Sequence, residues 1–412
     1  MFAAWKHNTK PTNHVMSKRV LILAGSPYQV PLIERAKQHG HYVITCDYLP
    51  RNPGHSIANE YYKVSTTDKE AVLKLARDLR VDAVATMSSD PAVPTVAHVA
   101  ASLGLPGPSV RSVEALTEKD KFRQLLSRIG LSAPRSYVVS TETVPDELVH
   151  SSHGYVVKPV DSSGSKGITY CDRSTEHQLG HAIRRALEHS RAGRCIIEEY
   201  IDGHQVHGDG YIQGGKLVYS YLGDHVFYTK THNFIPVSTR WPSRVSPESI
   251  LEVNRQVQMI VNAAEYQSGP VNIEARITRD GRVYIVEVGP RNGGNFVPLI
   301  QQRLTGFDFV ERILAGALGI RCAGDRENSR SEIGAHYILH ADRAGRYAGV
   351  SISDDAEQYI FFRSIFKREG EYVERFVGSN TTVGIILLRF DSIRERDDLM
   401  NAAELHFQTS VR

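Results

Sequence analysis

Residues 269–294 read GPVNIEARITRDGRVYIVEVGPRNGG, and this stretch predicts a β-hairpin. Apolar and polar side chains alternate on both sides of Asp280-Gly281, a dipeptide that favours a tight hairpin turn. Antiparallel pairing across the turn would bring Glu274 and Glu287 near each other. Two carboxylates held close together repel unless a proton or a cation lies between them, and hard oxygen ligands of this kind suit Mg²⁺. The alternative is an ordinary hairpin with two solvated glutamates.

The end of the same stretch offers groups for an anionic ligand. Arg291 carries a planar guanidinium that suits a carboxylate or phosphoryl group. Asn292, Gly293 and Gly294 follow it and allow the backbone to come close to a ligand. The hairpin therefore predicts a metal and anion site at its open end.

The composition predicts a globular protein of several domains. The chain has 412 residues, 41% hydrophobic and 23% charged, and its net charge of +3 is too small to indicate nucleic-acid or membrane binding. We expect the four separated cysteines to be reduced thiols without a catalytic role, and the protein to be cytoplasmic. No apolar run reaches the ~20 residues that span a bilayer. Residues 1–17 lack the apolar core of a signal peptide, and we expect a flexible tail there.

Residues 18–115 predict a doubly wound parallel sheet. Apolar strands alternate with amphipathic helices, in the ranges 18–25, 31–38, 42–47, 68–79, 81–87 and 93–103. Ligands gather at the carboxyl ends of such strands, which makes the Gly25-Ser26-Pro27 turn and Asp47 candidate ligand positions. The glycine pattern of a dinucleotide-binding fingerprint is incomplete there.

The rest of the chain predicts mixed structure. Helices are expected at 118–129, 175–190, 247–266 and 307–318, and strands at 136–140, 154–159 and 194–199. The segment 225–243 is expected to be irregular, because polar and aromatic residues follow no period there. Residues 331–412 alternate strands with a helix and predict a small α+β unit.

A second chemical motif begins at Val156-Val157-Lys158-Pro159 and continues as DSSGSKG at 161–167. Small residues leave backbone N–H groups free to surround phosphate oxygens, and the serine hydroxyls add donors. Lys158 offers a fixed positive charge at the end of a strand, and Lys166 offers another within the loop. The spacing is not that of a Walker A motif. A flexible surface loop is the alternative.

A third motif, IIEEYIDG at 196–203, is an apolar strand that leaves its sheet at an acidic pair. The backbone of such a segment can pair with the edge of an adenine ring. Solvated acids at a strand end are the alternative.

The three motifs occur in an order that resembles the ATP-grasp superfamily, specifically its carboxylate–amine ligases. The resemblance covers roughly residues 18–320 and also includes the segment EKDKFRQLLSRIGLSAP at 118–134. It implies a Rossmann-like pre-ATP-grasp domain at 18–115 and a small C-terminal α+β subdomain at 326–412. Between them it implies a two-lobed ATP-grasp domain at 116–325, with a small lobe at about 135–203 and a large lobe at about 204–325.

The resemblance also implies roles for individual residues. Lys121 and Lys158 would contact the ATP phosphates, and a mobile lid over them would comprise Ser162, Ser163, Gly164, Ser165, Lys166 and Gly167. The residues that would border adenine are Glu198, Glu199, Tyr200 and Ile201. Glu274 and Glu287 would hold Mg²⁺, with two ions expected and Mn²⁺ as an alternative, and Arg291 would stabilise an acyl phosphate.

Two positions depart from the family pattern. Gln205 stands where a ribose-binding glutamate is common, so it can hydrogen-bond a hydroxyl but adds no charge. Gly289 stands where the family often has a metal-binding asparagine. The second ion would then depend on Glu287, phosphate and water, or on a nearby group such as Asn292.

The resemblance implies an ATP-dependent ligase that activates a carboxylate as an acyl phosphate and joins it to an amine. The expected partners are small molecules and neither nucleic acid nor membrane, and a homodimer is a possible assembly. Residues expected to select the substrate are Lys230, Arg240, Asn292, Gly293 and Gly294. Two alternatives stay open: a bicarbonate-activating, carboxylase-type enzyme, and a nucleotide-binding protein that has lost catalysis.

Overall fold

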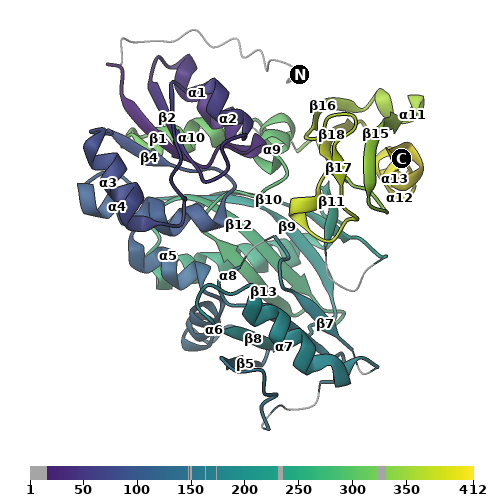
Figure 1. Cartoon of the computed structure of the whole chain (residues 1–412). Coiled ribbons are helices and arrows are strands. Elements are labelled where there is room, and N and C mark those ends of the chain that lie inside the picture. The colour runs from purple at the N-terminus through teal and green to yellow at the C-terminus, as the bar shows by residue number, and fades with distance from the viewer. Residues whose placement is uncertain are drawn as a thin grey trace.

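The computed structural model describes residues 16–146, 148, 151–162, 164–172, 174–230, 235–322 and 331–412. Within these ranges the strands form an N-terminal and a small-lobe sheet of four strands each, a central sheet of eight strands and a C-terminal sheet of three. Figure 1 shows the N-terminal sheet, the central sheet and the small lobe stacked from top to bottom, with the C-terminal unit beside them.

The N-terminal sheet is parallel, with strand order β3-β2-β1-β4, as predicted. Val20 and Ile22 of β1 pack toward α1, while Leu21 and Leu23 face α3 and α4. Apolar residues on both faces of one strand thus require helices on both sides, which is the doubly wound arrangement. The elements are β1 Arg19–Leu23, η1 Pro27–Gln29, α1 Val30–Gln38, β2 Tyr42–Cys46, α2 Pro53–Ile57, β3 Glu60–Tyr62, α3 Lys69–Asp78, β4 Ala83–Ala85, η2 Asp90–Ala92 and α4 Val93–Leu103.

Two helices lead from this sheet into the small lobe. The lobe's antiparallel sheet has the order β5-β8-β6-β7, and α7 packs on it through a strongly one-sided apolar face. The bounds are α5 Val110–Thr117, α6 Lys119–Arg128, β5 Ser136–Val139, β6 Tyr155–Pro159, β7 Thr169–Cys171, η3 Glu176–Gln178, α7 Leu179–Glu188 and β8 Cys195–Glu199.

The central sheet has the order β13-β12-β9-β10-β11-β14-β18-β16. Helix α8 covers one face, and α9 and α10 pack against the other. The bounds are β9 His204–Gln213, β10 Lys216–Phe227, β11 Pro236–Trp241, α8 Pro247–Ala264, β12 Ser268–Ile277, β13 Val283–Gly289, α9 Val297–Thr305, α10 Phe309–Ala317, β14 Ile333–Leu339, β16 Ile360–Ile365 and β18 Gly384–Phe390.

The predicted hairpin is confirmed as β12 and β13. Glu274 pairs directly with Glu287 across the two strands, and a bulge follows at Ala275. Gly281 has a φ of 81°, the left-handed conformation that the turn requires.

The expectation that 225–243 is irregular is wrong for residues 225–227 and 236–241. Strand β10 continues to Phe227, and β11 lies between β10 and β14. The partner strand β14 comes about a hundred residues later, so local periodicity could not reveal the pairing. Residues 231–234 lie outside the described ranges. Helices α2, α5 and α9 were also not predicted.

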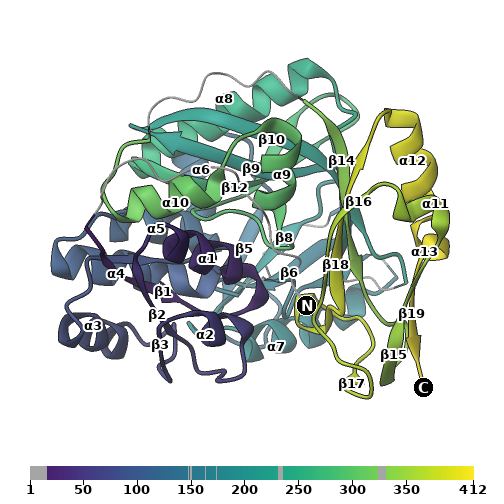
Figure 2. The same cartoon turned by 90° about the horizontal axis from the view of Figure 1, so that it is seen from above.

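The C-terminal residues extend the central sheet. β14, β18 and β16 complete one edge of it, and Figure 2 shows the remaining elements packed along that edge. These elements are β15 Gly345–Ile352, α11 Asp354–Glu357, β17 Tyr372–Val373, η4 Ser379–Thr381, α12 Ile393–Asn401, α13 Ala403–His406 and β19 Phe407–Val411. In the part of the chain that the structure describes, no helix is both long and apolar enough to cross a membrane.

Candidate active site

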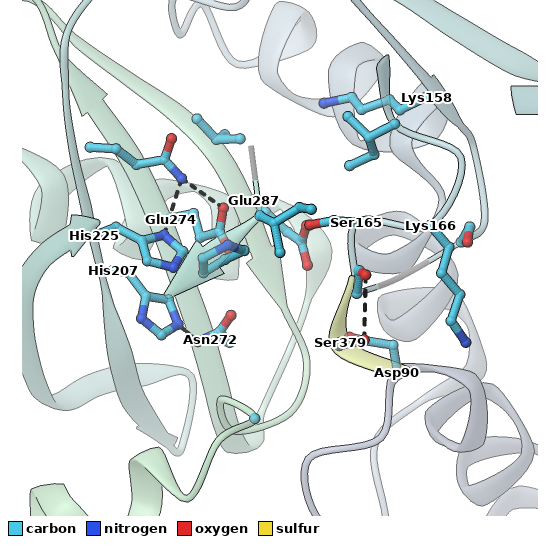
Figure 3. A pocket seen from close by; sticks show the side chains of 18 of the residues that line it. Asp90, Lys158, Ser165, Lys166, His207, His225, Asn272, Glu274, Glu287 and Ser379 are labelled. Carbon is cyan, nitrogen blue, oxygen red and sulfur yellow. Dashed lines mark hydrogen bonds between the residues drawn. The ribbon is translucent and has the colours of Figure 1, made fainter. Parts of the chain in front are cut away.

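A pocket of about 420 Å³ lies between the small lobe and the central sheet. The N-terminal sheet contributes the segment that follows β4, and the C-terminal unit contributes residues around η4. Figure 3 shows Glu274 and Glu287 in the middle of this pocket, with His207 and His225 on one side and Lys158 and Ser165 on the other. The three sequence motifs therefore meet in one place.

The two hairpin carboxylates face the pocket from adjacent strands. Burial, followed by the charge of Glu287, raises the pKa of Glu274 to about 7. Gln205 donates a hydrogen bond from Nε2 to Glu274 Oε2 at 3.0 Å. A divalent cation between the carboxylates would relieve their repulsion and leave positions for phosphate oxygens and water, so the pair fits Mg²⁺. Among the described residues no third carboxylate, histidine or cysteine completes a cluster with them.

The surroundings of Gly289 and Asn292 bear on the expected replacement for the metal-binding asparagine. A Cβ there would lie 3.3 Å from Glu287 Oε1 and 3.8 Å from Asp90 Oδ1, so the position faces the carboxylates. Asn292 does not face them, because it is fully buried and donates from Nδ2 to Ser88 Oγ at 2.6 Å.

Lys158 is held by a buried ion pair. Its Nζ lies 2.5 Å from Glu198 Oε2, and Arg123 donates from Nε to Glu198 Oε1 at 2.7 Å. Burial by itself would raise the pKa of Glu198, but the two cations hold it at about 2. Burial lowers the pKa of Lys158, and Glu198 opposes that effect. The carboxylate thus keeps an ammonium group charged and oriented at the mouth of the small lobe.

The Ser/Gly loop bends into the pocket. Ser162, Gly164, Ser165 and Lys166 line it, whereas Ser163 lies outside the described residues. Gly164 has a φ of 65° and Ser165 one of 60°, so two successive residues are left-handed. Gly167 does not line the pocket; a side chain there would come within 2.9 Å of Pro159 and 2.8 Å of His189.

The 196–203 segment forms one wall. Glu198, Glu199, Tyr200 and Ile201 all line the pocket. Arg276 fixes this wall, since it donates from Nη1 to the Ile201 carbonyl at 2.8 Å and lies 4.5 Å from the centre of the Tyr200 ring. Arg276 also donates from Nε to Gln205 Oε1 at 3.0 Å, which links the wall to the carboxylate pair.

Several predicted residues do not reach the pocket. Lys121 pairs with Glu118 at 2.9 Å on another face of α6, while Lys119 and Arg123, four residues apart, face the pocket instead. Among the residues proposed to select the substrate, only Gly294 lines it. The other four have structural partners: Lys230 pairs with Asp342 and Glu404, Arg240 donates to Asn401 and Met400, Asn292 to Ser88, and the Gly293 N–H to Asp209.

The N-terminal sheet supplies site residues that the sequence did not single out. Ser88, Ser89 and Asp90 follow β4 and line the pocket, and Tyr28 of η1 lines it as well. Asp47 instead accepts a hydrogen bond from Asn52 and does not line the pocket. The sequence did carry a signal for Ser88, Ser89 and Asp90, because they lie at the carboxyl end of a parallel strand, where ligands bind in such sheets.

Comparisons with known proteins agree with this geometry. A model of the ATP-grasp domain matches residues 151–298. The protein y4rH of Sinorhizobium fredii is 26% identical over 340 residues, which cover 77% of this chain and 68% of the relative. The carbamoyl phosphate synthase large chain of Caldanaerobacter subterraneus is 26% identical over 218 residues, and the match spans 52% of this chain but 19% of that relative.

A solved structure extends the match to the whole fold. The L-amino acid ligase of Bacillus licheniformis superposes with a TM-score of 0.81 and 22% identity, over 96% of this chain and 99% of that chain. Residues 151–298 therefore match the ATP-grasp domain, and the whole chain shares its fold with this ligase structure.

Proposed function

We propose that the protein is an ATP-dependent ligase that activates a carboxylate as an acyl phosphate and couples it to an amine. The observation that carries this proposal is the arrangement of one pocket, in which Lys158 of the small lobe faces the Glu274–Glu287 pair of the central sheet. A fixed cation opposite two carboxylates suits a nucleoside triphosphate with its metal ion.

The nucleotide end would use the small lobe. The 198–201 wall would border adenine, Gln205 would bind a ribose hydroxyl, and backbone N–H groups of the Ser/Gly loop would surround the phosphates. Lys158, Lys166 and the unpredicted Lys119 would supply positive charge there. Glu198 would act through Lys158 by orienting it.

The chemistry proposed for this site proceeds in two steps. A substrate carboxylate oxygen attacks the γ-phosphorus of ATP, the bond to the bridging oxygen breaks, and ADP leaves. An amine nitrogen then attacks the acyl carbon, loses a proton to solvent and expels phosphate. Mg²⁺ held by Glu274 and Glu287 would neutralise phosphate charge when bound. Lys158 and Arg291 would stabilise the charge on the transferring group and on the acyl phosphate, and the Ser/Gly loop would exclude water.

We also propose the division of labour among domains. Residues 18–115 would help to bind the carboxylate or amine, 116–325 would bind ATP, and 326–412 would close the far side of the pocket. Support comes from Asp90, Lys158 and Thr382, one residue from each part, which line the same pocket.

The test measures ATP turnover in the presence of Mg²⁺ and pools of amino acids and other carboxylic acids. ADP and phosphate should form together with a product lighter than its two precursors by one water, and Glu287→Gln should abolish turnover. AMP and pyrophosphate would contradict the acyl-phosphate mechanism. Turnover that depends on bicarbonate alone would favour the carboxylase-type alternative.

A further inference from the structure

The pocket continues past the carboxylate pair along the central sheet. From β12 it crosses β9, β10 and β11 to β14, where Ile338 forms part of its wall. Four strand spacings correspond to about 19 Å at ~4.8 Å each. The nucleotide end lies on the small-lobe side of the carboxylates, so this second end is available to a substrate.

The wall of the second end is apolar and built from distant parts of the chain. Phe227 of β10, Ile235 before β11, Ile338 of β14 and Phe376 after β17 line it, together with Tyr28 from the N-terminal η1. Ile235, Ile338 and Phe376 are at most 3% exposed and belong to one hydrophobic core.

The aromatic groups of this wall are fixed by ring contacts. The Tyr28 ring lies 5.1 Å from Phe296 in an edge arrangement, and its hydroxyl donates to Asn295 Oδ1 at 3.3 Å. Phe227 is half-buried, with its ring 4.9 Å from that of His225. Tyr28 and Phe227 therefore present the accessible surface of this wall, and their ring contacts hold it in a preformed arrangement.

Charge is confined to the other parts of the pocket. Among the described lining residues, none of the charged ones lies on β10, β11, β14 or in the C-terminal unit. Lys230 and Arg240, which the sequence offered as substrate-selecting residues, bind partners elsewhere. Burial lowers the pKa of His225 to about 3, so its imidazole is neutral at physiological pH. A charged substrate group placed at this end would lose its hydration without a partner.

We propose that this end of the pocket binds an uncharged apolar side chain, branched aliphatic or aromatic, of the substrate that reacts beside Arg291. Phe227, Ile235, Ile338, Phe376 and Tyr28 form the apolar subsite. The inference rests on the proposed ligase function, because that function defines which end holds ATP.

The test is binding to the full-length protein saturated with Mg²⁺ and a non-hydrolysable ATP analogue. Titration calorimetry compares L-leucine, L-phenylalanine and 3-phenylpropionate with L-aspartate and L-lysine. At least one apolar ligand should bind ten-fold or more tightly than either charged one. Equal or tighter binding of a charged ligand, or binding of none of the five, would overturn the proposal. Failure of the nucleotide analogue to bind would instead contradict the proposed ligase.

Variants locate the subsite. Phe227→Asp should lower the affinity for the apolar ligand ten-fold or more and leave nucleotide affinity unchanged. If this charged variant fails to fold, Phe227→Ala should also lower the affinity for the apolar ligand. Val218→Asp is the matched control, because Val218 lies on the same strand and is 52% exposed. Unchanged binding of the apolar ligand to a folded Phe227 variant would show that the subsite is elsewhere.

Discussion

Arg291 and Asp90, 201 residues apart, form a two-pronged ion pair with Nε–Oδ1 at 2.5 Å and Nη2–Oδ2 at 3.0 Å. Asp90 follows the last strand of the N-terminal sheet, and Arg291 follows the β12–β13 hairpin. Burial alone would lower the pKa of Arg291, but Asp90 raises it above its usual range. The guanidinium is therefore oriented before any substrate arrives, by a residue at the edge of the N-terminal sheet.

Replacing Asp90 tests that orientation. We expect Asp90→Asn to lower kcat for ADP formation by about 10–100-fold, the equivalent of the ~1.5–3 kcal/mol of a hydrogen bond to a charged group. Nucleotide affinity should change little, because the small lobe is untouched. Asp78→Asn, at an exposed pair with Lys74, is the control. A wild-type kcat for Asp90→Asn would refute the positioning role.

Two lysines of α6 compete for the role of phosphate ligand: the sequence resemblance implies Lys121, and the structure favours Lys119. Lys119 donates from Nζ to the Ser162 carbonyl at 2.7 Å and lines the pocket, whereas Lys121 pairs with glutamates outside it. Lys119→Met should raise the Kd for ATP about ten-fold, and Lys121→Met less than about two-fold. Calorimetric titration of both variants checks this, and the reverse order would restore the original assignment to Lys121.

Adjacent glutamates should differ sharply in their effect on folding. Glu198 is buried between Arg123 and Lys158, so Glu198→Gln leaves two buried cations without a charged partner and should cost about 3–5 kcal/mol of unfolding free energy. Glu199 pairs with Arg135, whose side chain is 51% exposed, and water screens that pair. Urea unfolding of Glu199→Gln should therefore show a much smaller change. Similar losses for both variants would contradict the buried-pair account.

Asp209 should make stability depend on pH. It is fully buried, its Oδ1 accepts from Gly293 N at 2.6 Å, and burial raises its pKa to about 7. The folded state then holds a proton that the unfolded state releases between about pH 4 and pH 7, so this group's contribution to stability falls as pH rises through that window.

Asp209→Asn removes this titration while its amide oxygen can still accept from Gly293. The difference in unfolding free energy between variant and wild type should shift in the variant's favour from pH 4 to pH 7 and then level off. Urea unfolding at several pH values measures this difference. Glu274 titrates in both proteins, so its contribution cancels when the two are compared. Parallel curves for the two proteins would show that Asp209 keeps an ordinary pKa.

Much of the fold and part of the site were accessible from sequence. Helix α4 was predicted to the residue, and the hairpin prediction brought Glu274 opposite Glu287. These features depend on short-range periodicity and turn chemistry. Strand β11 was missed because its pairing partners, and not its own pattern, make it a strand.

The sequence by itself determined the motifs: the Asp-Gly hairpin with its two glutamates, Lys158 ahead of a Ser/Gly loop, and the 196–203 strand end. Each is a local pattern, so the chemistry of its residues could be read without knowing the rest of the fold. Only the tertiary structure decided that Asp90 holds Arg291, that Lys119 rather than Lys121 faces the pocket, and that Tyr28 and Phe376 share one apolar wall. Those relationships join strands and loops far apart in the chain, and packing between sheets sets them.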